Sequence, residues 1–177
     1  YNKLRKESSI KKEILYVTAQ EHAVPSSMLA MIKYIKAEKN DYEQLITVNS
    51  GNIKESEERL KRYNLSDIQI ITRDDEKYLK SLSEAEYIFS DCGLEYYFAA
   101  KNNQKYFNLQ TDNISAKMTR KKERECFEFA TVQKSIITPK ASIYLTNESR
   151  LSFEKAYRCE MLPTSAIISD SPAFDMA

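Results

Sequence analysis

The sequence has 177 residues, with 27 basic and 26 acidic side chains and a formal net charge of +1. This balance excludes a global field that would draw the chain to nucleic acid, and the 2 glycines and 4 prolines exclude a collagen-like or disordered chain. One histidine and three widely spaced cysteines predict reduced thiols in a cytoplasmic protein and no metal site.

The first half of the chain alternates short apolar runs with amphipathic segments. Apolar runs of four or five residues bounded by polar residues predict buried strands. Such runs occur at residues 14–18, 45–48 and 68–71. The segments that follow them are expected to be helices, beginning near Pro25, Asn52 and Asp74. Asn52 and Glu55 have the spacing of a capping box at the start of the second helix.

Residues 85–113 are predicted to form a strand, a short helix, a second strand and a polar loop. The first strand, residues 85–89, ends at a turn cluster. Leu94 and Phe98 fall on one face of the short helix. Residues 104–109 alternate and are rich in aromatic side chains, which is typical of a strand.

The last part of the chain continues the alternation. A helix is expected at residues 119–134, followed by two short strand candidates, 135–138 and 142–145, between which periodicity does not choose. Thr146 or Asn147 caps the next helix. Residues 166–168 are predicted to be the last strand.

This order of elements predicts the fold class. Parallel neighbouring strands need crossover connections, and a helix usually supplies each of them. We therefore expect residues 1–177 to form a single α/β domain, with one doubly wound, mostly parallel sheet and helices on both faces. In such sheets, ligands bind at the carboxyl ends of the strands.

The first candidate site is the loop between the first strand and the helix that begins near Pro25. It contains Gln20, His22 and Ser26, and backbone N–H groups at a helix start favour anions. His22 is the only histidine, and a neutral imidazole is suited to act as a general base. The alternative is that His22 is structural or merely exposed.

The second candidate site comprises two turns that are expected at the same edge of the sheet. Asp112 has the chemistry of a general base or of an acceptor for a sugar-like hydroxyl. Alternatively, the Asp and Asn residues are there because they tolerate turn geometry. The other expected substrate ligands at these turns are Ser90, Asp91, Gln110, Thr111 and Asn113.

A basic run follows the second of these turns. It consists of Lys117, Arg120, Lys121, Lys122 and Arg124. These side chains suit a phosphorylated substrate or an anionic membrane surface. Interleaved glutamates equally predict a solvated helix face with pairs four residues apart.

Several segments resemble one known family. Residues 104–108, QKYFN, resemble a strand with the pattern QKYLNT that runs into a loop WHGTP. Residues 85–91, AEYIFSD, resemble the preceding strand and turn, and residues 141–157 and 166–175 resemble later elements. These features are typical of the CDP-glycerol glycerophosphotransferases, the teichoic acid and capsule polymerases of Gram-positive bacteria.

The resemblance implies a glycosyltransferase fold of the B type, of which this chain resembles the Rossmann-like N-terminal lobe. That lobe meets a polyol-phosphate or glycan acceptor, and a C-terminal lobe outside this chain holds the CDP-activated donor. The chain itself is therefore expected to need no cofactor and to be inactive alone. The implied location is the cytoplasm, with peripheral contact to the anionic inner face of the bacterial cell membrane.

The resemblance breaks at the catalytic loop. Asn108 matches the family asparagine, whereas Gln110 stands at the tryptophan position and Thr111 at the position of the catalytic histidine. Lys117 matches a lysine that follows the motif, with a slip of one residue. A threonine hydroxyl is too weak a base at neutral pH. Either Asp112 or His22 therefore replaces the base, or the lobe has lost catalysis and acts as a binding or scaffolding module.

Overall fold

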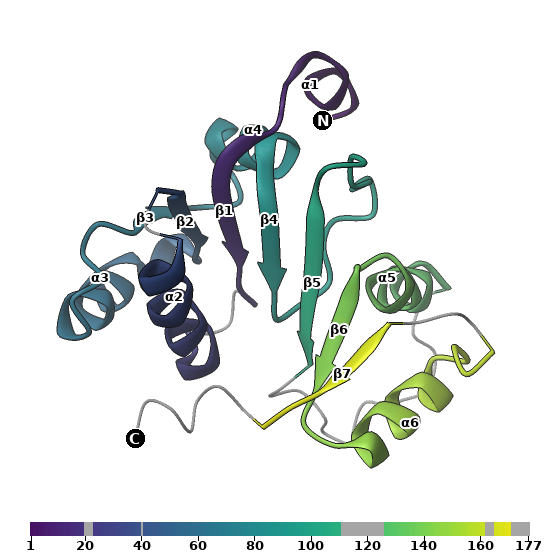
Figure 1. The fold of residues 1–177 in the computed structure, drawn as a ribbon. Helices are drawn as coiled ribbons and strands as arrows, with labels where there is room; N and C mark the ends of the chain where they lie inside the picture. The colour runs from purple at the N-terminus through teal and green to yellow at the C-terminus, as the bar shows by residue number, and fades with distance from the viewer. Residues whose placement is uncertain (20–22, 40, 111–125, 162–164, 171–177) are drawn as a thin grey trace.

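The structure is a computed structural model that describes residues 1–19, 23–39, 41–110, 126–161 and 165–170. A seven-stranded sheet forms its centre, with the strand order β3-β2-β1-β4-β5-β6-β7 (Figure 1). The strands are β1 (Lys11–Val17), β2 (Glu43–Thr47), β3 (Gln69–Ile71), β4 (Ala85–Ser90), β5 (Lys105–Gln110), β6 (Ala141–Tyr144) and β7 (Ala166–Ile168). Every neighbouring pair is parallel, which confirms the predicted fold class.

Helices cover both faces of this sheet. They are α1 (Asn2–Glu7), α2 (Ser26–Glu38), α3 (Ile53–Arg62), α4 (Glu76–Glu84), α5 (Cys126–Ile137) and α6 (Asn147–Ala156), with a 3₁₀ turn η1 (Ser50–Asn52) before α3. The apolar side chains of α2 and α3 pack on one face, and those of α4 pack on the other. This two-sided arrangement follows from crossover connections between parallel strands.

Alternation along β1 explains how one strand serves both cores. Ile14 and Tyr16 lie in the cluster beneath α2, whereas Leu15 and Val17 lie in the cluster beneath α4. All four side chains are fully buried, as expected for a central strand of a doubly wound sheet. The apolar run that predicted this strand therefore reflects burial on both of its faces.

The short helix predicted between β4 and β5 is wrong. Residues 91–104 form turns and extended segments instead, although Leu94 and Phe98 are both buried as a helical face would require. Lys134 of α5 donates hydrogen bonds to the carbonyl oxygens of Tyr96 and Phe98, both at 2.6 Å. A side chain from another element thus satisfies backbone acceptors that a helix would satisfy locally.

Three further local predictions are resolved. Asn52 precedes α3 without a side-chain cap, so the predicted capping box there is wrong; Asn49 instead accepts a hydrogen bond from the Gly51 N–H at 3.0 Å. Thr146 does cap α6, in a reciprocal capping box with Ser149. Of the two strand candidates, residues 142–145 correspond to β6, whereas residues 135–137 belong to α5. The predicted start of that helix lies outside the described residues.

Candidate functional site

The strand order reverses between β1 and β4, and the carboxyl ends of these strands lie side by side with that of β5 (Figure 1). Val17 pairs in register with Ser90, and Ser90 with Asn108. Crossover connections leave the sheet in opposite directions at such a reversal, which opens a crevice that ligands use. This edge is therefore the place to examine side-chain chemistry.

The end of β1 is held by polar contacts on both sides. On the β2 side, the Thr18 hydroxyl donates to the Thr47 carbonyl at 2.6 Å, and the Thr18 N–H donates to the Thr47 hydroxyl at 3.1 Å. On the β4 side, the Ala19 N–H donates to Asp91 Oδ1 at 2.7 Å, and the Asp91 N–H donates to the Val17 carbonyl at 3.3 Å. The backbone that leads into the first loop thus leaves the sheet in a fixed direction.

Arg73, two residues after β3, contacts residues that follow β1 and β4. Its Nη2 donates to the Thr18 carbonyl at 3.1 Å and to Cys92 Sγ at 3.0 Å, and its Nη1 lies 3.4 Å from Glu95 Oε1. The other carboxylate oxygen of Glu95 accepts a hydrogen bond of 2.5 Å from the buried Tyr78 hydroxyl. A guanidinium held on several sides in this way has little freedom to rotate.

In the turn after β4, polar groups of the turn itself bond to one another. The Ser90 hydroxyl is fully buried and donates to the Cys92 carbonyl at 2.6 Å. Burial raises the pKa of the Cys92 thiol, and the neighbouring Arg73 guanidinium opposes that rise without reversing it. The thiol therefore stays protonated at neutral pH, which does not suit a nucleophile.

The start of α2 carries a second arginine contact. Arg59 Nη2 of α3 donates to the Ser26 hydroxyl at 2.7 Å. A helix amino terminus bears partial positive charge, so the guanidinium and the helix start together favour an anion nearby.

The predicted site residues fall into two groups. Gln20, His22, Thr111, Asp112, Asn113 and Lys117 lie outside the described residues. Ser26, Ser90, Asp91 and Gln110 are described, and all four lie at the carboxyl edge or at the start of α2. Gln110 is the buried last residue of β5, and Asp91 is half-buried beside Ala19. Their part in substrate binding stays a prediction.

Sequence reasoning missed Arg59, Arg73 and Glu95. Arg73 lies two residues after a predicted strand, so the rule that points to strand ends was sufficient to select it. Arg59 and Glu95 carry no comparable signal, because only tertiary contacts bring them to their partners. Within the described part of the chain, no group of three His, Cys, Asp or Glu residues is arranged to hold a metal ion.

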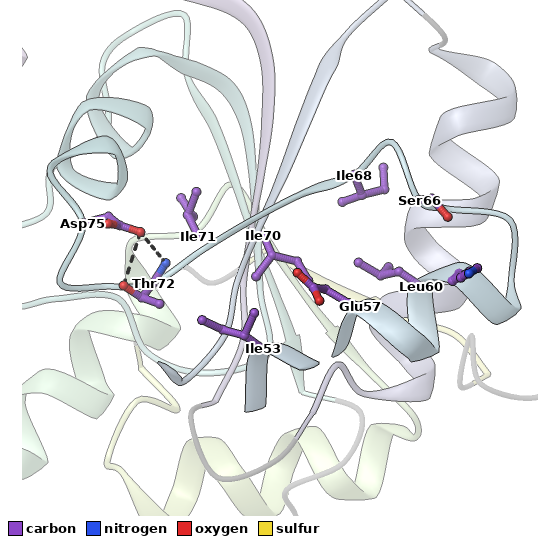
Figure 2. A pocket seen from close by; sticks show the side chains of 10 residues that line it. Ile53, Glu57, Leu60, Ser66, Ile68, Ile70, Ile71, Thr72 and Asp75 are labelled. Carbon is purple, nitrogen blue, oxygen red and sulfur yellow. Dashed lines mark hydrogen bonds between the residues drawn. The ribbon is translucent and has the colours of Figure 1, made fainter. Parts of the chain in front are cut away.

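A groove of about 390 Å³ lies elsewhere, between α3 and the edge strand β3 (Figure 2). Its walls include Ile53, Leu60 and Ile70. At one end the Asp75 carboxylate accepts hydrogen bonds from the Thr72 N–H and hydroxyl, at 3.0 and 3.3 Å. A further strand pairing with the edge strand β3 would need the Thr72 N–H as a donor, and the bond to Asp75 already occupies it.

The sequence pattern of the CDP-glycerol:poly(glycerophosphate) glycerophosphotransferases matches residues 2–164. The chain belongs to this family. Among curated proteins, none matches the sequence. The match confirms the resemblance over residues 85–164 and extends it to the earlier half of the chain, whereas the resemblance of residues 166–175 stays a prediction.

Solved structures with a similar fold include the wall teichoic acid polymerase TagF. One TagF structure, soaked with CDPG, has a TM-score of 0.65 at 15% identity, over 97% of this chain and 45% of TagF. Another TagF structure has a TM-score of 0.63 at 14% identity, over 92% of this chain and 39% of TagF. This chain therefore spans less than half the length of the TagF chains it matches. None of its described helices has the length and hydropathy needed to cross a bilayer.

Proposed function

We propose that residues 1–177 form the acceptor-side lobe of a two-lobed glycerophosphotransferase of teichoic acid or capsule synthesis. CDP-glycerol or a related CDP-activated donor binds in a second lobe outside these residues, so the chain is inactive alone. The observation that carries this proposal is the family match over residues 2–164. The partial coverage of TagF supports the assignment to one lobe of a larger enzyme.

The acceptor is a polyol-phosphate or glycan chain, and its reacting end binds at the carboxyl edge of β1, β4 and β5. Arg59 and the start of α2 provide positive charge for an acceptor phosphate beside that edge. Asp91 follows β4 and Gln110 is the last residue of β5, and their carboxylate and amide groups are of the kind that hydrogen-bond hydroxyls. Gln20, Ser90, Thr111, Asn113 and Lys117 complete the proposed set of ligands.

The general base that deprotonates the acceptor hydroxyl is His22 or Asp112. The experiment is transfer of glycerol phosphate from CDP-glycerol by the intact protein and by its His22→Ala and Asp112→Ala variants. Loss of about 100-fold or more in kcat identifies the base.

Asp41→Ala is the matched control for this assay, because Asp41 is an exposed carboxylate at the opposite edge of the sheet. It is expected to turn over at the parent rate. Unchanged turnover in both His22→Ala and Asp112→Ala excludes both residues as the base.

A second candidate function is a non-catalytic module that binds polymer or a partner lobe. Thr111 favours it, because this residue stands where the resemblance places the catalytic histidine. In that case the intact protein binds a glycerol-phosphate oligomer but shows no transfer from CDP-glycerol. Transfer above background excludes this alternative.

The protein is proposed to act in the cytoplasm, at the inner face of the cell membrane. The basic run that begins at Lys117 would supply the contact with anionic lipid. Cosedimentation with vesicles containing anionic lipid tests this: binding that disappears in about 0.5 M salt supports it, and binding equal to that for neutral vesicles contradicts it.

A further inference from the structure

The contacts of Arg73 and Asp91 meet on a single peptide unit. The Thr18 carbonyl accepts from Arg73 Nη2 at 3.1 Å, and the Ala19 N–H donates to Asp91 Oδ1 at 2.7 Å. This carbonyl and this N–H belong to the same planar peptide, and in a trans peptide they point in opposite directions. Arg73 and Asp91 therefore hold the peptide from opposite sides and fix its rotation about the chain.

We propose that Arg73 is a positioning residue that fixes the Thr18–Ala19 peptide and thereby orients Asp91 for the acceptor. The inference deepens the proposed function and rests on it only for the identity of the acceptor. Arg73 does not touch the acceptor. It acts through the peptide that gives Asp91 its hydrogen-bond donor.

The guanidinium is suited to this task because it is itself held. Its Nη1 faces Glu95 at 3.4 Å, and Glu95 is fixed by the buried hydroxyl of Tyr78 at 2.5 Å. Its Nη2 also contacts Cys92 Sγ at 3.0 Å, in the turn that contains Asp91. Arg73 thus ties the turn after β4 to the end of β1 through one planar group.

A lysine at position 73 keeps the positive charge but lacks the two nitrogens that a planar guanidinium holds in fixed directions. An ammonium is a compact point charge, and one ammonium cannot reproduce contacts made by two separate guanidinium nitrogens in fixed directions. Arg73→Lys is therefore the informative variant, since it separates charge from geometry. Glu95→Gln is a milder second variant, which keeps Arg73 but removes the carboxylate charge that faces its guanidinium.

Arg5→Lys is the matched control. Arg5 Nε and Nη2 donate to the carbonyls of Ala99 and Ala100 at 2.7 and 3.1 Å, so this arginine also holds backbone by a fork. It lies in α1, before the amino end of β1, far along the strands from the carboxyl edge (Figure 1). Any general cost of replacing a structural arginine appears in both variants.

The first arm of the test measures amide hydrogen exchange by NMR on residues 1–177, with no ligand. Arg73→Lys should accelerate exchange at the Ala19 amide about tenfold, while amides in the middle of β1 exchange as in the parent. Arg5→Lys should leave Ala19 unchanged. An Ala19 amide that is equally protected in parent, Arg73→Lys and Glu95→Gln overturns the inference, whatever the acceptor is.

The second arm measures the Kd of a synthetic glycerol-phosphate oligomer in a double-mutant cycle. Arg73→Lys should weaken binding about 3- to 10-fold in the parent and not at all in the Asp91→Asn background, because the effect passes through Asp91. Equal effects in both backgrounds overturn the proposal. If the parent binds no oligomer, the proposed acceptor is wrong, and the exchange arm still decides the role of Arg73.

Discussion

The two edges of the central strands differ in how many of their charged side chains form ion pairs. At the carboxyl edge, side chains bond to backbone atoms: Asp91 to Ala19, Arg73 to Thr18, and Thr18 to Thr47. At the amino edge, Arg5 and Gln104 also bond to backbone carbonyls, but charged side chains in addition pair with one another, mostly at the surface. The pairs are Lys11–Glu84, Lys12–Asp41, Lys77–Glu43 and Lys105–Glu86.

The side chain–backbone bonds hold the carboxyl edge in a fixed geometry, whereas the ion pairs of the amino edge lie mostly at the solvated surface. Bonds between side chain and backbone within the protein fix the direction of the chain, and an unmade partner there is costly. Exposed ion pairs pay side-chain entropy and are screened, so they add little. The proposed site therefore lies at the carboxyl edge, where side chains fix the ends of β1 and β4.

The largest effect is expected for Asp91→Ala. It leaves the half-buried Ala19 N–H without its acceptor, and the free energy of unfolding should fall by about 2 kcal/mol. Urea unfolding followed by circular dichroism measures it. Asp41→Ala removes a carboxylate at the amino edge and should leave the unfolding midpoint unchanged. Equal losses in the free energy of unfolding for Asp91→Ala and Asp41→Ala would contradict the proposed difference between the two edges.

Next in size is Tyr78→Phe, which removes the donor that holds Glu95. The expected loss is about 1 kcal/mol in the free energy of unfolding, since the bond is charge-assisted and the ring keeps its packing. Tyr42→Phe is its counterpart, because the Tyr42 hydroxyl donates to Glu86 at 2.8 Å near the amino edge. Urea titration should show a smaller loss there, and a larger loss in Tyr42→Phe contradicts the account.

A third prediction concerns pH. Burial raises the pKa of the Glu13 carboxyl, against an opposing hydrogen bond from Ser81. A raised folded-state pKa favours the fold while the carboxyl is protonated, and this contribution is lost as pH rises through the folded pKa. Glu13→Gln should therefore stabilise the chain at about pH 7 and have no effect well below the ordinary value of 4.5.

Thermal unfolding of the parent and Glu13→Gln across this pH range measures the effect. Glu58→Gln, at an exposed glutamate of α3 that does not influence Glu13, is the control and should follow the parent curve. Destabilisation by Glu13→Gln at neutral pH would mean that the ionised carboxylate is favoured in the fold.

The smallest effect is expected for Lys12→Ala. Lys12 pairs with Asp41 at the surface, and both side chains are more than half exposed. The unfolding midpoint should not change measurably, at low or high salt. A clear, salt-dependent loss would show that surface pairing stabilises the amino edge after all.

The sequence was sufficient to predict the sheet because central strands such as β1 are apolar on both faces, and that signal is local. It was not sufficient for residues 91–104, where the spacing of Leu94 and Phe98 indicated a helix. There Lys134, from a helix distant in the sequence, donates hydrogen bonds to backbone carbonyls that a local helix would otherwise have used. The same limit applies to the site. Strand ends pointed to Asp91, whereas its bond to Ala19 depends on a pairing of strands that are far apart in the chain.

Amide chemical-shift mapping with a glycerol-phosphate oligomer tests the placement of the acceptor most directly. The account predicts saturable shifts at Thr18, Ala19, Asp91 and Gln110, with none at Lys11, Lys12 or Lys105. Shifts confined to the amino edge, or to the groove between α3 and β3, would contradict it.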